Sequence, residues 1–127
     1  MPATLLSLIL SLISAAWGMW GATNPPKVDV VYNATASASL WAAAGPEPNG
    51  NCLLTIYKPF AIEAQFSEQQ SARTINHEMG HCLGLQHDTL AFDLMNPIST
   101  VQVPSWHDLW VYHQLLGYHV AVAEVAP

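Results

Sequence analysis

Residues 67–88 read SEQQSARTINHEMGHCLGLQHD and contain the strongest structural pattern in the chain. Ser67 followed by Gln70 forms a capping box, which predicts that a helix begins here. The apolar residues that follow are spaced by three, four, three and one positions, so they form one stripe on a helix: Ala72, Ile75, Met79, Cys82 and Leu83. The sequence therefore predicts a helix from Ser67 to about Leu83 that packs this stripe on a sheet.

Three histidines lie on or just after this predicted helix. His77 and His81 are four residues apart, so both imidazoles lie on one side of a helix and can bind one ion. Gly84 lets the chain turn back, because glycine adopts positive φ at little cost, and this brings His87 to the same ion. Three neutral imidazoles leave a fourth position for water, as in a catalytic zinc site. Glu78 is rotated by about 100° from His77 and can reach that water without binding the ion.

The predicted ligand face is opposite the apolar stripe. With Ile75 taken as zero on a helical projection, the stripe centres at about 30°, whereas His77 lies at about 200° and His81 at about 240°. We therefore expect the helix to form the floor of a cleft with its back against a sheet.

The string HEMGHCLGLQH, residues 77–87, resembles the long zinc motif of the metzincin metalloproteases, which is accompanied by a methionine-containing turn. Met95 lies eight residues after the third histidine in DLMNP, and this spacing is similar to that of the matrixin (matrix metalloproteinase) branch. Residues 108–117 are similar to the C-terminal helix of that branch. Asp88 instead resembles the adamalysin and snapalysin pattern, which leaves the subfamily open.

The resemblance implies a zinc-dependent endopeptidase with one catalytic Zn²⁺ held by His77, His81 and His87. Met95 would form an apolar base beneath the imidazoles. Glu78 would act as general base and then general acid in peptide-bond hydrolysis. A peptide or protein substrate would lie as an added strand on an exposed sheet edge, which we expect at residues 52–58. We expect the protein to be a monomer.

The rest of the chain predicts a small α+β domain of the metzincin type with a reduced sheet. Residues 27–32 and 52–57 are predicted strands, and residues 60–64 a weaker third strand. The Ala-rich residues 35–44 predict a helix, followed by a loop at residues 45–51. A last helix is predicted from Ser105 to about Leu116, with Ser105 as its cap and Gly117 ending it.

The N-terminal residues 4–22, TLLSLILSLISAAWGMWGA, contain no charged side chain. They predict a cleaved secretory signal, a membrane anchor with Trp17 and Trp20 at the interface, or a buried helix. The predicted division is therefore a signal or anchor at residues 1–22 and a catalytic domain at residues 23–127. Either of the first two alternatives makes the domain secreted or extracytoplasmic. There Cys52 and Cys82 could form a disulfide, and the alternative is two buried free thiols.

Charge excludes one class of partner. The 127 residues include 3 Lys and Arg against 9 Asp and Glu, a formal net charge of −6, which excludes nucleic-acid binding as the main activity. Two alternatives to a protease remain from the sequence. One is a zinc-binding metzincin-like module without turnover that acts in protein binding, and the other is a small membrane-anchored structural protein with incidental histidines.

Overall fold

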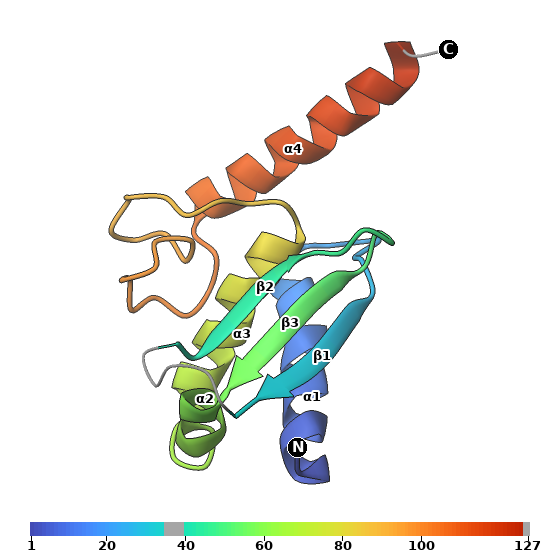
Figure 1. Ribbon diagram of the computed structural model, residues 1–127. Coiled ribbons are helices and arrows are strands. Elements are labelled where there is room, and N and C mark those ends of the chain that lie inside the picture. The colour runs from blue at the N-terminus through green and yellow to red at the C-terminus, as the bar shows by residue number, and fades with distance from the viewer. Residues whose placement is uncertain (35–39, 126–127) are drawn as a thin grey trace.

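The computed structural model describes residues 1–34 and 40–125, of which residues 117–125 are described by their backbone alone. The fold is α+β, as predicted (Figure 1). The elements in chain order are α1 (Ala3–Trp20), β1 (Val28–Asn33), β2 (Ala42–Pro46), β3 (Cys52–Tyr57), α2 (Lys58–Glu63), α3 (Glu68–Cys82) and α4 (Trp106–Val125).

The strands form one mixed sheet in the order β1-β3-β2. β1 is parallel to β3, with Val28 opposite Cys52, and β2 is antiparallel to β3, with Ala44 opposite Leu54. Alternate residues of β3 are buried, because side chains along a strand point to opposite faces in turn. Helices α1 and α3 lie on the same face of the sheet (Figure 1). The two strands predicted at residues 27–32 and 52–57 are confirmed.

Two predicted elements are wrong. Residues 42–46 form strand β2 instead of the end of a helix over 35–44, of which residues 35–39 lie outside the described residues. The neighbouring edge of β3 provides hydrogen bonds that outweigh the helix propensity of three alanines. Residues 60–64 lie mostly in helix α2 instead of a strand. Pro59 stands in the first turn of that helix, where its fixed φ is favourable.

Helix α3 begins as predicted. The Ser67 side chain accepts a hydrogen bond from the Gln70 N–H at 3.2 Å. Ile75 and Met79 are fully buried, so the apolar stripe packs into the core. A disulfide joins Cys82 at the end of α3 to Cys52 at the start of β3, which decides between the two alternatives for the thiols.

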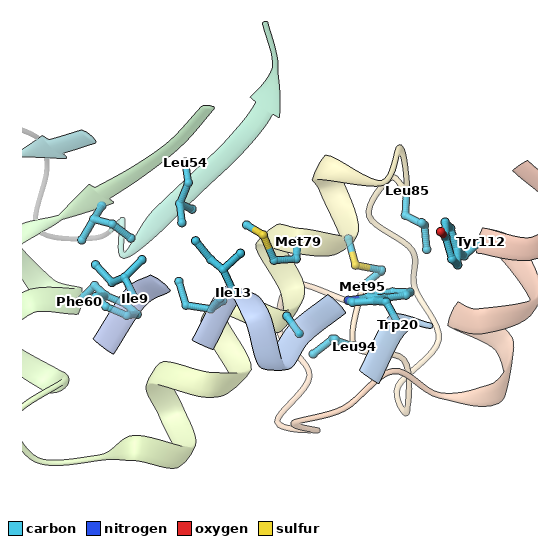
Figure 2. Close-up of a cluster of buried hydrophobic side chains, with 13 residues drawn as sticks. Ile9, Ile13, Trp20, Leu54, Phe60, Met79, Leu85, Leu94, Met95 and Tyr112 are labelled. Atoms are coloured by element: carbon cyan, nitrogen blue, oxygen red, sulfur yellow. The ribbon is translucent and has the colours of Figure 1, made fainter. Parts of the chain in front are cut away.

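Helix α1 supplies a large part of the core. Ile9, Ile13, Ala16 and Trp20 are spaced by four, three and four residues and are all buried. Figure 2 shows Ile9, Ile13 and Trp20 in this core. Trp20 donates a hydrogen bond from Nε1 to the main-chain oxygen of Asn76 in α3 at 2.9 Å. The same helix is long and apolar enough to cross a membrane. One apolar segment thus has the composition of a signal or anchor and also packs against the domain, and the disulfide is consistent with an extracytoplasmic location.

Helix α4 extends away from the body of the molecule (Figure 1). The predicted cap is confirmed, since Ser105 Oγ accepts a hydrogen bond from the Asp108 N–H at 3.0 Å. The predicted end at Gly117 is wrong, because the helix continues to Val125. A single glycine within a helix costs only about 1 kcal/mol relative to alanine.

Candidate metal centre and cleft

The three predicted ligands converge. His77 Nε2 lies 3.2 Å from His87 Nε2, and one ligand nitrogen from each of the three rings lies within 4.8 Å of the others. The ring centroids are 4.9 Å apart for His77 and His81, 5.2 Å for His77 and His87, and 4.7 Å for His81 and His87. This group could hold a metal ion.

Hydrogen bonds on the far side of two rings fix which nitrogen faces the centre. His77 Nδ1 lies 2.7 Å from the Leu94 carbonyl oxygen, and His81 Nδ1 lies 2.8 Å from the Leu85 carbonyl oxygen. Because a carbonyl only accepts, each Nδ1 carries the proton and each Nε2 keeps its lone pair for an ion. Burial lowers the pKa of His77 to about 4 and also lowers that of His81, which keeps both rings neutral at pH 7.

The chain reverses direction after α3 as the sequence predicts. Gly84 has φ +100°, a left-handed conformation that favours glycine. The Leu85 N–H donates to the Gly80 carbonyl at 3.0 Å, which closes the turn after the last residue of the helix. This reversal brings the exposed His87 to the two helical histidines.

Met95 packs against α3 at a glycine. It is fully buried, and a Cβ added to Gly80 would lie 2.4 Å from Met95 Sδ. Gly80 stands between His77 and His81 in the sequence, so the methionine occupies space directly against the segment that carries the two ligands. The buried Asp108 carboxylate accepts hydrogen bonds from the N–H groups of Leu94 at 2.7 Å and of Met95 at 3.4 Å, which fixes this turn.

The three histidines line a cleft of about 490 Å³ between α3 and strand β2. Glu78 lines the same cleft and is only 7% exposed. Burial raises the pKa of Glu78 to about 8, although a hydrogen bond from the Ala44 N–H acts in the opposite direction. His77 and Glu78 are both buried, so the ligand face of α3 is covered by neighbouring segments instead of forming an open floor.

The predicted substrate edge is wrong. Residues 52–57 form the central strand β3, which is paired on both sides, whereas β2 is an edge strand and borders the cleft. The Tyr57 N–H donates to the Trp41 carbonyl. In an antiparallel ladder the direction of backbone groups alternates, so those of Ala42 and Ala44 point away from β3. The hydrogen bond from Ala44 to Glu78 agrees with this direction.

A second group of ionisable side chains lies beside the Met95 turn. Asp93 is fully buried, accepts a hydrogen bond from Ser105 Oγ at 2.6 Å and lies 2.5 Å from His107 Nδ1. Asp88 lies close to both, and the three could also hold an ion. Burial, together with the hydrogen bond and charge of Asp93, raises the pKa of Asp88 to about 6. These contacts connect the turn to the start of α4.

The chain matches no known protein-family model, and no curated protein is significantly similar to it. Function is therefore inferred from the site. The structure brings His77, Glu78, His81 and His87 together in one cleft. Gly84 forms the predicted turn and Met95 packs against Gly80, but neither residue lines the cleft. The sequence did not predict the contacts that Asp108, Asp93 and Arg73 make at or beside the site. Of these, only Arg73 had a local signal, because it precedes His77 by one helical turn.

Proposed function

We propose that the protein is a zinc-dependent endopeptidase. The observation that carries the proposal is the convergence of three imidazoles beside a buried glutamate in a cleft bordered by an edge strand. The resemblance of residues 77–87 to the metzincin motif supports the same activity. His77, His81 and His87 would hold the ion, and Zn²⁺ suits a set of three neutral nitrogens with a position left for water.

Zinc at this centre would polarise the scissile carbonyl and lower the pKa of water toward about 7. Glu78 is the only carboxylate among the described residues that line the cleft. It takes a proton from the attacking water and delivers it to the leaving amine. A cation bound at this centre would lower the pKa of the Glu78 carboxyl group and so favour its ionised form.

Substrate binding is assigned to strand β2. An extended peptide can pair with the edge strand through backbone hydrogen bonds, because the groups of Ala42 face away from β3. A substrate bound in this way would have a peptide bond between the edge strand β2 and the three histidines. Backbone pairing of this kind would hold the main chain of the substrate in the cleft and leave its side chains free for separate contacts.

The proposed site of action is outside the cytoplasm. The disulfide between Cys52 and Cys82 forms and persists in an oxidising compartment. The apolar helix α1 is consistent with export of the chain or its attachment to a membrane.

The test compares Glu78→Gln with the wild-type full-length protein. We expect the variant to keep one zinc ion per chain, measured by metal analysis. We expect its rate of casein or quenched-peptide cleavage to fall by about 10²–10⁴-fold, the usual contribution of a general base. Glu68→Gln is the matched control, because Glu68 is an exposed glutamate in the first turn of the same helix.

Two results would contradict the proposal. One is cleavage by Glu78→Gln at the wild-type rate, and the other is wild-type cleavage that survives complete removal of metal by a chelator. Stoichiometric zinc with no cleavage of any peptide would instead indicate a binding module.

A further inference from the structure

Arg73 is a partly buried cation that lines the cleft. It precedes His77 by four residues, so the two side chains lie on the same side of α3, about 6 Å apart along its axis. Both line the cleft. The Nε atom of Arg73 is buried with no hydrogen-bond partner, and no carboxylate among the described residues forms an ion pair with the guanidinium. Burial also lowers the pKa of Arg73.

This cation is unusual for the protein. The chain contains only three Lys and Arg residues, and the other two, Lys27 and Lys58, are absent from the cleft lining. Residues 35–39, which precede the rim of the cleft, have the sequence TASAS and contain no acid. A partly desolvated charge without a counterion destabilises the folded protein. An acidic protein that keeps one of its few cations in this position therefore has a place for an anion from outside the chain.

We propose that Arg73 is a specificity-determining residue that binds an acidic side chain of the substrate. The proposal rests on the proposed function, because it places the acid within two residues of the scissile bond. Alternate side chains of an extended peptide are about 7 Å apart, which matches the distance of about 6 Å between Arg73 and His77 along the helix. A guanidinium binds a carboxylate through two parallel hydrogen bonds, so an acid is favoured over a neutral amide of the same shape.

The cleft offers polar neighbours for the same group. Gln70 and Thr74 flank Arg73 on α3 and also line the cleft. The inferred subsite is therefore polar and positively charged.

The experiment measures cleavage of matched quenched peptides by the full-length protein. The peptides carry Glu, Gln or Lys at each position within two residues of the scissile bond. We expect the wild type to cleave the best Glu peptide at least tenfold faster than its Gln counterpart, as kcat/KM. Arg73→Gln should lose this preference and cleave the Glu and Gln peptides at similar rates. Arg73→Lys should retain part of the ratio, and Arg73→Glu should favour the Lys peptide.

A matched control separates a local contact from a change in net charge. Lys58→Gln removes the same charge at an exposed position outside the metal cleft and should keep the wild-type ratio. If Lys58→Gln lowers the ratio as much as Arg73→Gln, a long-range charge effect explains the preference and the inference is wrong.

A binding measurement distinguishes failure of this inference from failure of the proposed function. Fluorescence anisotropy of labelled Glu and Gln peptides is measured with Glu78→Gln, alone and combined with Arg73→Gln. Preferential binding of the Glu peptide that depends on Arg73, with no cleavage by the wild type, would support the subsite and contradict the protease. Cleavage with equal rates and equal binding for Glu and Gln peptides would overturn the subsite alone.

Inorganic phosphate tests a free anion as the occupant. If an acidic side chain is the ligand, phosphate should displace the Glu peptide only weakly and leave binding of the Gln peptide unchanged. If phosphate binds through Arg73 while Glu and Gln peptides bind equally, the ligand is a free anion and the inference about the substrate is overturned.

Discussion

The two sides of helix α3 serve different purposes. The side toward α1 is apolar and closed: Ile75 and Met79 are fully buried, and the indole of Trp20 donates to the helix backbone. Figure 2 shows Met79 and Trp20 in the buried cluster. The side toward β2 contains ionisable groups that border a cleft, among them Arg73, His77 and Glu78. Packing on one side thus determines the position of the helix, while the other side is left for ligands.

The two sides of α3 differ in the charged groups that they contain. The closed side has no charged group between α1 and α3 among the described buried residues, so its stability comes from apolar burial. The cleft side contains a guanidinium with an unpartnered Nε and a carboxyl whose pKa is raised by burial. Ionisable groups in such environments are typical of functional sites and cost stability. Changes on the closed side should therefore affect folding most, and changes on the cleft side should affect binding most.

Removal of residues 1–22 is expected to have the largest effect, because it takes away the closed side. Trp20 is one of the fully buried residues of this helix, and truncating a buried tryptophan to alanine by itself costs about 3–5 kcal/mol. Total stabilities are only about 5–15 kcal/mol, so loss of the whole helix should leave an unfolded chain. Circular dichroism and urea unfolding of the shortened and full-length proteins measure this.

Trp20→Ala and Leu10→Ala refine the same test. The first should lower the free energy of unfolding by about 3–5 kcal/mol. The second changes an exposed residue of the same helix and should shift it by less than about 0.5 kcal/mol. A chain without residues 1–22 that unfolds cooperatively and binds zinc would show instead that α1 serves export or membrane attachment only.

Local patterns in the sequence predicted α3 well. The Ser67 cap, the apolar stripe and the glycine turn each depend on residues within about one or two helical turns, and the structure has all three. The helix predicted over residues 35–44 was wrong at residues 42–44, which belong to strand β2. Alanine favours a helix unless a neighbouring strand supplies hydrogen bonds. That neighbour, β3, follows β2 in the chain and pairs also with β1, which no local pattern of β2 reveals.

Substitution at Gly80 is expected to have an intermediate effect, because this residue lies where the two sides meet. An added Cβ would lie 2.4 Å from Met95 Sδ and 2.8 Å from Trp20 Cζ2, so both side chains must move. Overpacking of this kind costs about 1–3 kcal/mol. Gly80→Ala should therefore lower the free energy of unfolding by that amount in urea titrations, and zinc affinity should fall with it.

Gly18→Ala is the matched control, because it makes the same change in helix α1. No atom lies within 4 Å of an added Cβ there. Alanine is the better helix former, so this variant should gain about 0.5–1 kcal/mol. Equal stability of Gly80→Ala and the wild type would mean that Met95 and Trp20 move aside freely.

The site was predicted less completely than its helix. The ligands His77, His81 and His87 follow from spacing within one segment. Asp108, which holds the Met95 turn, comes from α4 and approaches only when the chain has folded. The edge strand was assigned to residues 52–58 because strand order cannot be deduced from strand composition. Long-range packing, not local propensity, determines both features.

Proline at Ala42 is expected to have the smallest effect on stability and tests the cleft side alone. Ala42 is the first residue of β2, where proline is tolerated, and its N–H points away from β3 by the alternation of the ladder. If a substrate strand accepts that N–H, its loss removes one hydrogen bond, worth about 0.5–1.5 kcal/mol. Ala42→Pro should therefore lower kcat/KM on a peptide about 2- to 12-fold, mostly through KM, with zinc content unchanged.

Ala42→Val keeps the N–H and should bind the peptide as the wild type does. Equal KM values for all three proteins would mean that the substrate does not pair with β2 at this residue.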